Sequence, residues 1–245
     1  RYGGRLSSVI DVRMKEGNEN EFNGKFSIGN VASKLNVEVP IVKGKSSFNI
    51  SARRTYIDIL TRPLVRLATG GDQTAGYYFE DLNAKFNYRI NEKHRVYLSM
   101  YYGDDKAFTR FGFESDEFQE STETQLRWGN ITGSARWNWE IGPKLFSNLT
   151  FNVSNYKMLT GFESDYTEFG QSYNSFFEYT SGIRDVSLKH DFDFIPSPQH
   201  YIRAGYQVIY HTFNPGINQF SSDIDGDVLQ NEFGNEYQYG TEISL

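Results

Sequence analysis

A strict alternation of apolar and polar residues runs through most of the chain, and no other feature restricts its fold as strongly. In residues 82–90 every second side chain is apolar, and residues 96–102 resume the pattern after the polar turn 91–94. Successive side chains of a β-strand point to opposite faces, so each run has one apolar face and one polar face. The two runs and the short turn between them predict an antiparallel hairpin.

The same hairpin unit recurs along the chain, with short turns at one end of the strands and long loops at the other. Further strands are expected at residues 22–28, 35–41, 48–53, 131–141, 145–153, 186–194, 202–210 and 237–245. Short turns are expected at 43–46, 91–94, 142–144 and 196–199, and long loops at 57–76, 113–124, 163–175 and 215–236. Residues 57–67, around Pro63, favour a short helix, and Pro40 favours an edge or a bulge. About ten strands with short turns at one end predict an all-β fold, a transmembrane antiparallel β-barrel.

Composition is compatible with this fold and argues against several others. The mean hydropathy is −0.59, and no run approaches the roughly 18 apolar residues of a membrane-spanning helix. Half of each barrel strand faces inward, so a low average hydropathy is expected. The net charge of −6 is dispersed, which gives no support for a nucleic-acid partner. The absence of cysteine excludes disulfides, thiolate metal sites and cysteine nucleophiles.

The alternation assigns candidate residues to each face of the expected barrel. The polar positions should line the lumen or contact a plug, namely Lys85, Arg89, Arg136, Lys189, Asp191 and Asp193. The aromatic positions near the short turns should form an interfacial girdle, namely Tyr88, Trp137, Trp139, Phe192 and Phe194. Core packing is the alternative role for these aromatics. On this assignment, arginine at Leu149 or Ala84 should be destabilising, whereas arginine at Asn87 or Thr132 should matter less.

No catalytic centre is apparent, so we expect no enzymatic activity, no catalytic residues and no cofactor. The chain has no phosphate-binding loop, nucleophile elbow or acid/base pair. The four histidines are scattered without metal-ligand spacing, at His94, His190, His200 and His211. The expected metal content is therefore none.

One acidic segment has some of the spacing of a calcium loop. Asp223, Asp225 and Asp227 alternate around a glycine, and Glu232 follows. Calcium requires several carboxylate oxygens on a sharp turn, but the full loop pattern is incomplete here. An acidic surface loop accounts for the segment as well.

Three segments resemble TonB-dependent outer-membrane receptors. The first is Arg1-Tyr2-Gly3-Gly4-Arg5-Leu6-Ser7-Ser8-Val9-Ile10-Asp11-Val12, which is similar to the end of the plug domain in that family. The second, residues 22–26, fits the first barrel strand after a short polar linker. The third, residues 51–56, resembles a segment at the top of the third strand in one large branch of the family.

The resemblance implies a domain organisation and a function. Residues 1–14 would be the C-terminal end of the plug, 15–21 the linker, and 22–245 the N-terminal part of a plugged barrel of 22 strands. The chain would then be an internal piece of a longer receptor that imports a scarce nutrient by ligand capture and plug gating. Arg53 and Arg54 are candidate ligand contacts at the mouth, since guanidinium groups bind carboxylates; a salt bridge is the alternative.

The same resemblance implies the surroundings and partners of the chain. It would lie in the bacterial outer membrane, in contact with its lipid, and would receive energy from the TonB complex through the missing N-terminal region. A surface lipoprotein is a further partner compatible with the family. The short turns would face the periplasm.

Two other functions fit the alternation. One is a passive porin or adhesin-type barrel without a plug, and the other is a secreted, soluble β-sandwich that binds glycans. For the receptor fragment we expect an open, curved antiparallel sheet, with residues 6–14 inside its curve and the final strand cut short.

Overall fold

The computed structural model describes residues 14–115, 118–224, 227–234 and 236–245, which form one antiparallel sheet and one helix. The helix is α1 (Ile57–Ala68). The sheet has 11 strands: β1 (Asn23–Ile28), β2 (Ala32–Val42), β3 (Ser46–Thr55), β4 (Gln73–Arg89), β5 (His94–Glu114), β6 (Phe118–Gly142), β7 (Leu145–Glu168), β8 (Gln171–Ser197), β9 (His200–Ile224), β10 (Asp227–Phe233) and β11 (Gln238–Ser244). No helix among the described residues is both long and apolar enough to cross a membrane.

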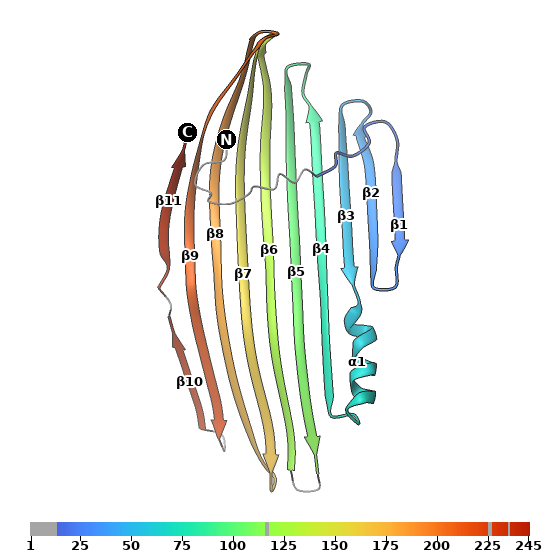
Figure 1. The fold of residues 1–245 in the computed structure, drawn as a ribbon, viewed down its shortest axis with the longest axis vertical. Helices are drawn as coiled ribbons and strands as arrows, with labels where there is room; N and C mark the ends of the chain where they lie inside the picture. The colour runs from blue at the N-terminus through green and yellow to red at the C-terminus, as the bar shows by residue number, and fades with distance from the viewer. Residues whose placement is uncertain (1–13, 116–117, 225–226, 235) are drawn as a thin grey trace.

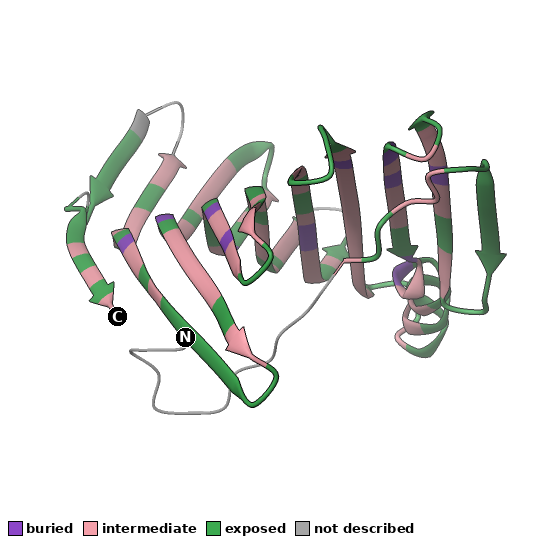
Figure 2. Cartoon of the chain, turned by 90° about the horizontal axis from the view of Figure 1, so that it is seen from above, coloured by how far each residue is buried: buried purple, intermediate pink, exposed green. Residues whose placement is uncertain are grey.

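Each strand pairs with the next one along the chain, as far as β10 (Figure 1). The last strand is short, and it pairs with residues 207–213 of β9, whereas β10 pairs with residues 218–224 of the same strand. The sheet is open, with β1 at one side and β10 and β11 at the other (Figures 1 and 2). The all-β, antiparallel, open sheet expected from the sequence is confirmed. The place expected for residues 6–14 falls almost entirely outside the described residues.

The connections at one end of the strands are as the sequence predicted, and those at the other end are not. Short turns connect β2–β3, β4–β5, β6–β7 and β8–β9 at one end, as expected. The predicted long loops at 113–124, 163–175 and 215–236 are wrong, because the strands continue through most of these residues. The β7–β8 connection, for example, is only Phe169 and Gly170. Strands such as β6, with 25 residues, extend far beyond the ten residues expected.

Two smaller expectations are confirmed. The register of β2 and β3 shifts between Pro40 and Val42, which is the bulge expected for a proline that cannot donate to the ladder. The break in alternation after residue 56 is α1, which contains Pro63. Strand β3 stops at Thr55, and α1 packs against β4 beyond that point (Figure 1). The helix thus covers the edge of β4 that β3 leaves unpaired.

The register assigns every side chain to one of two faces. We call the face that contacts residues 14–21 the linker face, and the other the outer face. One row of paired residues on the outer face is apolar throughout: Phe48, Phe86, Leu98, Ala135, Phe151, Leu188, Val208 and Ile243. The adjacent row on the linker face is polar except for one tyrosine: Ser47, Asn87, Tyr97, Arg136, Thr150, Lys189 and Gln207.

Burial in this sheet is reversed relative to a water-soluble domain. Among the described residues, Ile209 is the only buried apolar side chain, whereas 11 polar or charged residues are buried. The large apolar side chains of the outer face are exposed, with Leu98 at 54% and Phe151 at 45%. A contiguous exposed apolar surface of this kind marks an interaction with another apolar phase.

Candidate functional site

The apolar part of the outer face is a band of limited height. It begins beside the short turns, at Trp139 on β6, and ends at Ile131 on the same strand. These residues are eight positions apart, about 27 Å along a strand at roughly 3.4 Å per residue. A tilt of about 40° reduces this to roughly 20 Å of height, comparable with the roughly 25 Å apolar band of outer-membrane barrels.

A row of charged and small residues ends the band. It crosses six strands in register: Arg54, Glu80, Asp104, Gly129, Lys157 and Gly182. We call this the charged row, and we call the parts of β4–β10 that lie beyond it the extension. In β6 the extension is residues 118–128.

Aromatic rings gather on the outer face at the short-turn end of the band. The five girdle candidates share this face, since Tyr88 is in register with Trp137 through Val96, and Trp139 with Phe192 through Ser147. Trp137 and Trp139 stack with ring centroids 5.5 Å apart and an interplanar angle of 2°. The Trp137 indole N–H also donates to His94 Nδ1 at 3.2 Å. The contact of these rings with lipid stays a prediction.

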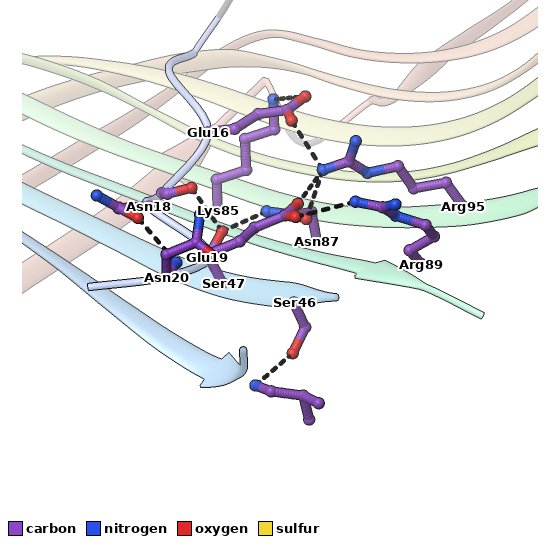
Figure 3. Close-up of polar contacts among 12 residues, drawn as sticks. Glu16, Asn18, Glu19, Asn20, Ser46, Ser47, Lys85, Asn87, Arg89 and Arg95 are labelled. Carbon is purple, nitrogen blue, oxygen red and sulfur yellow. Dashed lines mark hydrogen bonds and ion pairs between the residues drawn. The ribbon is translucent and has the colours of Figure 1, made fainter. Parts of the chain in front are cut away.

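The linker, residues 15–21, and Met14 just before it cross the linker face over β2–β5, where backbone groups hold them (Figure 3). Four carbonyl groups of this segment accept hydrogen bonds from the sheet: Met14 O from Lys85 Nζ (3.1 Å), Lys15 O from Asn49 Nδ2 (3.0 Å), Gly17 O from Ser47 Oγ (2.8 Å) and Glu19 O from the Gly44 N–H (2.9 Å). A Cβ at Gly17 would lie 2.9 Å from the Phe48 carbonyl oxygen, so the close approach of the two backbones requires glycine.

Glu38 is a buried carboxylate that binds the linker at two points. Its side chain accepts a hydrogen bond from Lys15 Nζ at 2.6 Å and another from the Asn18 backbone N–H at 3.0 Å. Only 5% of Glu38 is exposed. A buried charge is tolerated when it is paired and hydrogen-bonded, and here both partners come from the linker.

A second ionic cluster holds the linker from the other side (Figure 3). Glu19 pairs with Arg95 and lies 3.2 Å from Arg89 Nη2, and Glu16 lies 3.2 Å from Arg95 Nη2 and 3.5 Å from Lys85 Nζ. Three cations from β4 and β5 therefore meet two linker carboxylates. Such a network is stronger than isolated surface pairs because its members share partners. Together with the Glu38 contacts, this network fixes the linker at one position on the sheet. We call the contacts of Glu38 and of this ionic cluster with the linker the linker clamp.

The other predicted lumen residues share the linker face but do not reach the linker. Arg136, Lys189, Asp191 and Asp193 lie farther across the sheet, on β6 and β8. Lys189 Nζ is 3.6 Å from Asp191, and Asp193 binds Arg203 Nε at 2.5 Å. Their side of the sheet is as the alternation predicted, whereas their role in a lumen stays a prediction.

Arg53 and Arg54 do not form a joint site. They are adjacent on β3 and therefore project to opposite faces, and each is in register with a different carboxylate of β4. On the linker face, Arg53 Nη2 lies 2.6 Å from Asp81. On the outer face, Arg54 Nε lies 3.9 Å from Glu80. The geometry corresponds to the salt-bridge alternative, and the two guanidinium groups cannot bind one anion together.

The acidic segment near the end of the chain is a hairpin. Asp223 lies in β9 opposite Val228 of β10, and Glu232 lies opposite Gln219. Asp225 falls outside the described residues. Among the described residues no group of three or more histidine or acidic side chains is placed to hold a metal ion. Of the histidines, His211 Nδ1 is 2.8 Å from Asp185, and His190 Nε2 is 2.7 Å from the Ser147 hydroxyl.

A second candidate surface, which the sequence did not predict, lies on the linker face of the extension. Here the two faces exchange character, and aromatic rings occupy the linker face. In one row Phe162, Phe177 and Phe220 lie directly opposite one another on three strands, each about 40% exposed. Tyr77 of β4 and Trp128 of β6 stack at 6.3 Å on the same face, and Trp128 is in register with Met158, four residues along β7 from Phe162. We call these five rings the aromatic ladder.

The cations of the extension lie on the face opposite to these rings. All of its described cations project from the outer face, namely Lys106, Arg110 and Arg127, so the linker face there carries none. Asp105 is one of the few carboxylates on the linker face, and it accepts a hydrogen bond from the Tyr77 hydroxyl at 2.6 Å. That hydrogen bond, with burial and the carboxylate charge, raises the pKa of Tyr77 to about 12. Tyr77 therefore remains a protonated, neutral ring at physiological pH.

Comparisons with known proteins identify no family. No protein-family model matches the chain, and no curated protein matches it. Among solved structures, a bacterial polysaccharide outer membrane secretin is similar at 9% sequence identity and a TM-score of 0.11, over 86% of this chain and 88% of that chain. A likeness at that level carries no argument about fold or function.

Proposed function

We propose that this chain is part of a TonB-dependent outer-membrane receptor that captures a scarce nutrient and imports it by energy-coupled gating of a plug. One observation carries the proposal: at the charged row, the apolar side chains change from the outer face to the linker face. No single solvent suits both faces along their whole length. Two different environments, one on each side of the charged row, would suit them.

Below the charged row, the outer face suits lipid and the linker face suits water. Leu98 and Phe151 are exposed on the outer face, and lipid tails would cover them. The polar row behind them, which includes Arg136 and Lys189, would face a wet lumen. The edge groups of β1 would be paired by further strands, because lipid cannot satisfy backbone hydrogen bonds.

Above the charged row, the outer face suits water and the linker face suits a ligand. The extension would then stand outside the cell, and the short turns would face the periplasm. The aromatic ladder, free of cations, favours a ligand that is uncharged and presents ring or sugar faces for stacking, rather than an anion.

The linker clamp gives the plug a fixed attachment. In a receptor whose plug is pulled from its N-terminal side, force would reach the sheet through residues 14–21. Glu38 and the Arg95 cluster would hold that point, so the moving part would lie upstream of Met14. A passive porin without a plug has no need of such an anchor, which favours the receptor over that alternative.

Membrane placement is tested with single cysteines in the full-length protein, since the chain described here has none of its own. An environment-sensitive fluorophore at Leu98 or Phe151 should be quenched by brominated lipid. The same label at the neighbouring Ser99 or Asn152, on the linker face, should be quenched little. Equal quenching at both pairs would contradict the barrel, and the absence of quenching everywhere would favour the soluble β-sandwich.

Energy coupling is tested by uptake in whole cells. Uptake of the ligand should require both the receptor and an active TonB complex, and should stop in cells that lack the complex. Uptake that persists without the complex would favour a passive porin. The linker clamp supplies an internal control, because loosening it should impair import more than ligand binding at the surface.

A further inference from the structure

A cleft lies between α1 and the outer face of β4–β6, in the extension just beyond the charged row. Its volume is about 460 Å³. Residues from both elements line it: Arg62, Pro63 and Arg66 of α1, and Thr74, Tyr78, Lys106, Phe108, Arg110 and Glu123 of the sheet. The cleft is separate from the linker clamp and from the aromatic ladder, both of which lie on the opposite face.

The cleft is strongly basic. Four cations line it, and Glu123 is the one acidic lining residue, 3.7 Å from Lys106 Nζ and 3.1 Å from Arg110 Nε. Arg62 pairs with Asp58 at 3.3 Å, behind the lining. Two carboxylates therefore face four cations, which leaves two positive charges in excess.

Two of the four cations lie over the aromatic ring of Phe108. The Arg62 guanidinium lies 4.8 Å from the centroid of the Phe108 ring, and Lys106 Nζ lies 5.7 Å from it. These contacts orient the groups without neutralising them. Arginine side chains from two directions around a partly enclosed space suit a phosphate group, which accepts bidentate hydrogen bonds from guanidinium.

The position of the cleft indicates where that phosphate comes from. Lys106 is two outer-face positions beyond Tyr102, the last apolar residue of the band on β5. That separation is about 14 Å of strand at roughly 3.4 Å per residue. Arg127, in register with Lys106, lies at the same level, where it pairs with Asp104 at 2.9 Å.

We propose that this cleft binds the phosphate of a lipid headgroup in the outer leaflet of the membrane. The proposal depends on the proposed function, because it needs the apolar band to be embedded in lipid with the extension outside. In that placement the apolar band contacts the acyl chains, and the four cations of the cleft face the headgroup layer. The bound lipid would then join α1 to the sheet through one shared anion.

The test uses the full-length protein purified in detergent, with lipid binding measured by native mass spectrometry. The probes are bis-phosphorylated lipid A, its dephosphorylated form and inorganic phosphate. The R66Q/R110Q double variant should bind the phosphorylated lipid at least about tenfold more weakly. The charge-matched double variant K43Q/K93Q, in two short turns at the opposite end of the strands, should bind it as the wild type does.

Three outcomes would overturn the lipid assignment. The first is that R66Q/R110Q binds the phosphorylated lipid as tightly as the wild type does. The second is that the wild type binds the dephosphorylated lipid as tightly as the phosphorylated one. The third is that inorganic phosphate saturates the site and excludes the lipid. Outer-membrane fractionation of the same strains separates this result from the proposed function. A wild type that inserts normally but fails to bind overturns the cleft alone, whereas a wild type that does not insert overturns the proposed function.

Discussion

Asn87 and Ser47 form a fully buried polar pair beneath the linker. The Asn87 side-chain amide donates to the Ser47 hydroxyl at 2.5 Å, and neither residue is exposed. The Ser47 hydroxyl donates in turn to the Gly17 carbonyl, and Asn87 Oδ1 accepts from Arg95 Nη2 at 2.8 Å. The pair therefore supports the linker directly and also positions one of the cations that bind its carboxylates.

This pair corrects one expectation of the sequence analysis and gives the first prediction. Alternation alone placed Asn87 on the polar face and suggested that arginine there should matter less than in the apolar band, but Asn87 is fully buried. Asn87→Ala should destabilise the protein by about 1–3 kcal/mol, because buried partners lose a hydrogen bond. Asn83→Ala, on the same face of the same strand, should cost less. Thermal unfolding of the two variants measures the difference, and equal losses would contradict a special role for the pair.

The linker should also loosen when Glu38 is removed. Glu38→Ala leaves the Asn18 N–H without its acceptor and Lys15 without its partner. Hydrogen exchange at the Asn18 amide should accelerate at least about tenfold, since a hydrogen bond to a charged group contributes roughly 1.5–3 kcal/mol. Glu21→Ala, an exposed linker carboxylate, is the control. If both variants exchanged like the wild type, Glu38 would not hold the linker.

The lipid face is tested by two adjacent substitutions on β7. Leu149→Arg would place a charge in the apolar band, with an expected cost of about 2–4 kcal/mol in a membrane barrel. Asn148→Arg, on the linker face opposite Asp191, should cost much less. Urea unfolding in lipid vesicles gives both values. A similar cost for the two would show that the faces do not meet different solvents.

The sequence predicted the part of this sheet between the short turns and the charged row well and the extension poorly, and the reason is physical. Alternation with a consistent apolar face identifies strands such as 82–90 and 145–153. In the extension the alternation persists, but its apolar side is the other face, as Phe162 and Phe177 show. A prediction that requires one continuous apolar face therefore ends each strand at the charged row and assigns the residues of the extension to a loop.

The functional contacts were harder to predict because they depend on register. The alternation of a strand already places Arg53 and Arg54 on opposite faces, but only the register with β4 shows that Asp81 and Glu80 lie beside them. The linker clamp joins Glu38 to Asn18 and Arg95 to Glu16, over separations that no local motif records. The rings of the aromatic ladder come from five different strands, β4, β6, β7, β8 and β9, and only strand pairing brings them to one face.

The aromatic ladder should bind the ligand proposed above. The F162A/F177A double variant should weaken binding of labelled, uncharged oligosaccharides by at least about tenfold, since each stacking contact contributes roughly 0.5–1.5 kcal/mol. Glu163 and Glu178 lie next to these rings on the outer face, and E163A/E178A is the matched control. Fluorescence anisotropy on the full-length protein provides the measurement. If the control were as weak as the ring variant, the ladder would not be the contact surface.

The β7–β8 turn contains a strained residue, and relieving it should stabilise the extension. Phe169 has a φ of 48° and Gly170 a φ of 82°, the left-handed pair that a two-residue hairpin requires. Phenylalanine is poorly suited to this region, where an L-residue costs roughly 1–2 kcal/mol and asparagine is better tolerated. Because 75% of Phe169 is exposed, removing its ring sacrifices little packing. Phe169→Asn should therefore slow hydrogen exchange in residues 164–175 by several-fold, and Gly170→Ala should accelerate it. Exchange that is faster in Phe169→Asn than in the wild type would show that the ring contributes a contact that outweighs its strain.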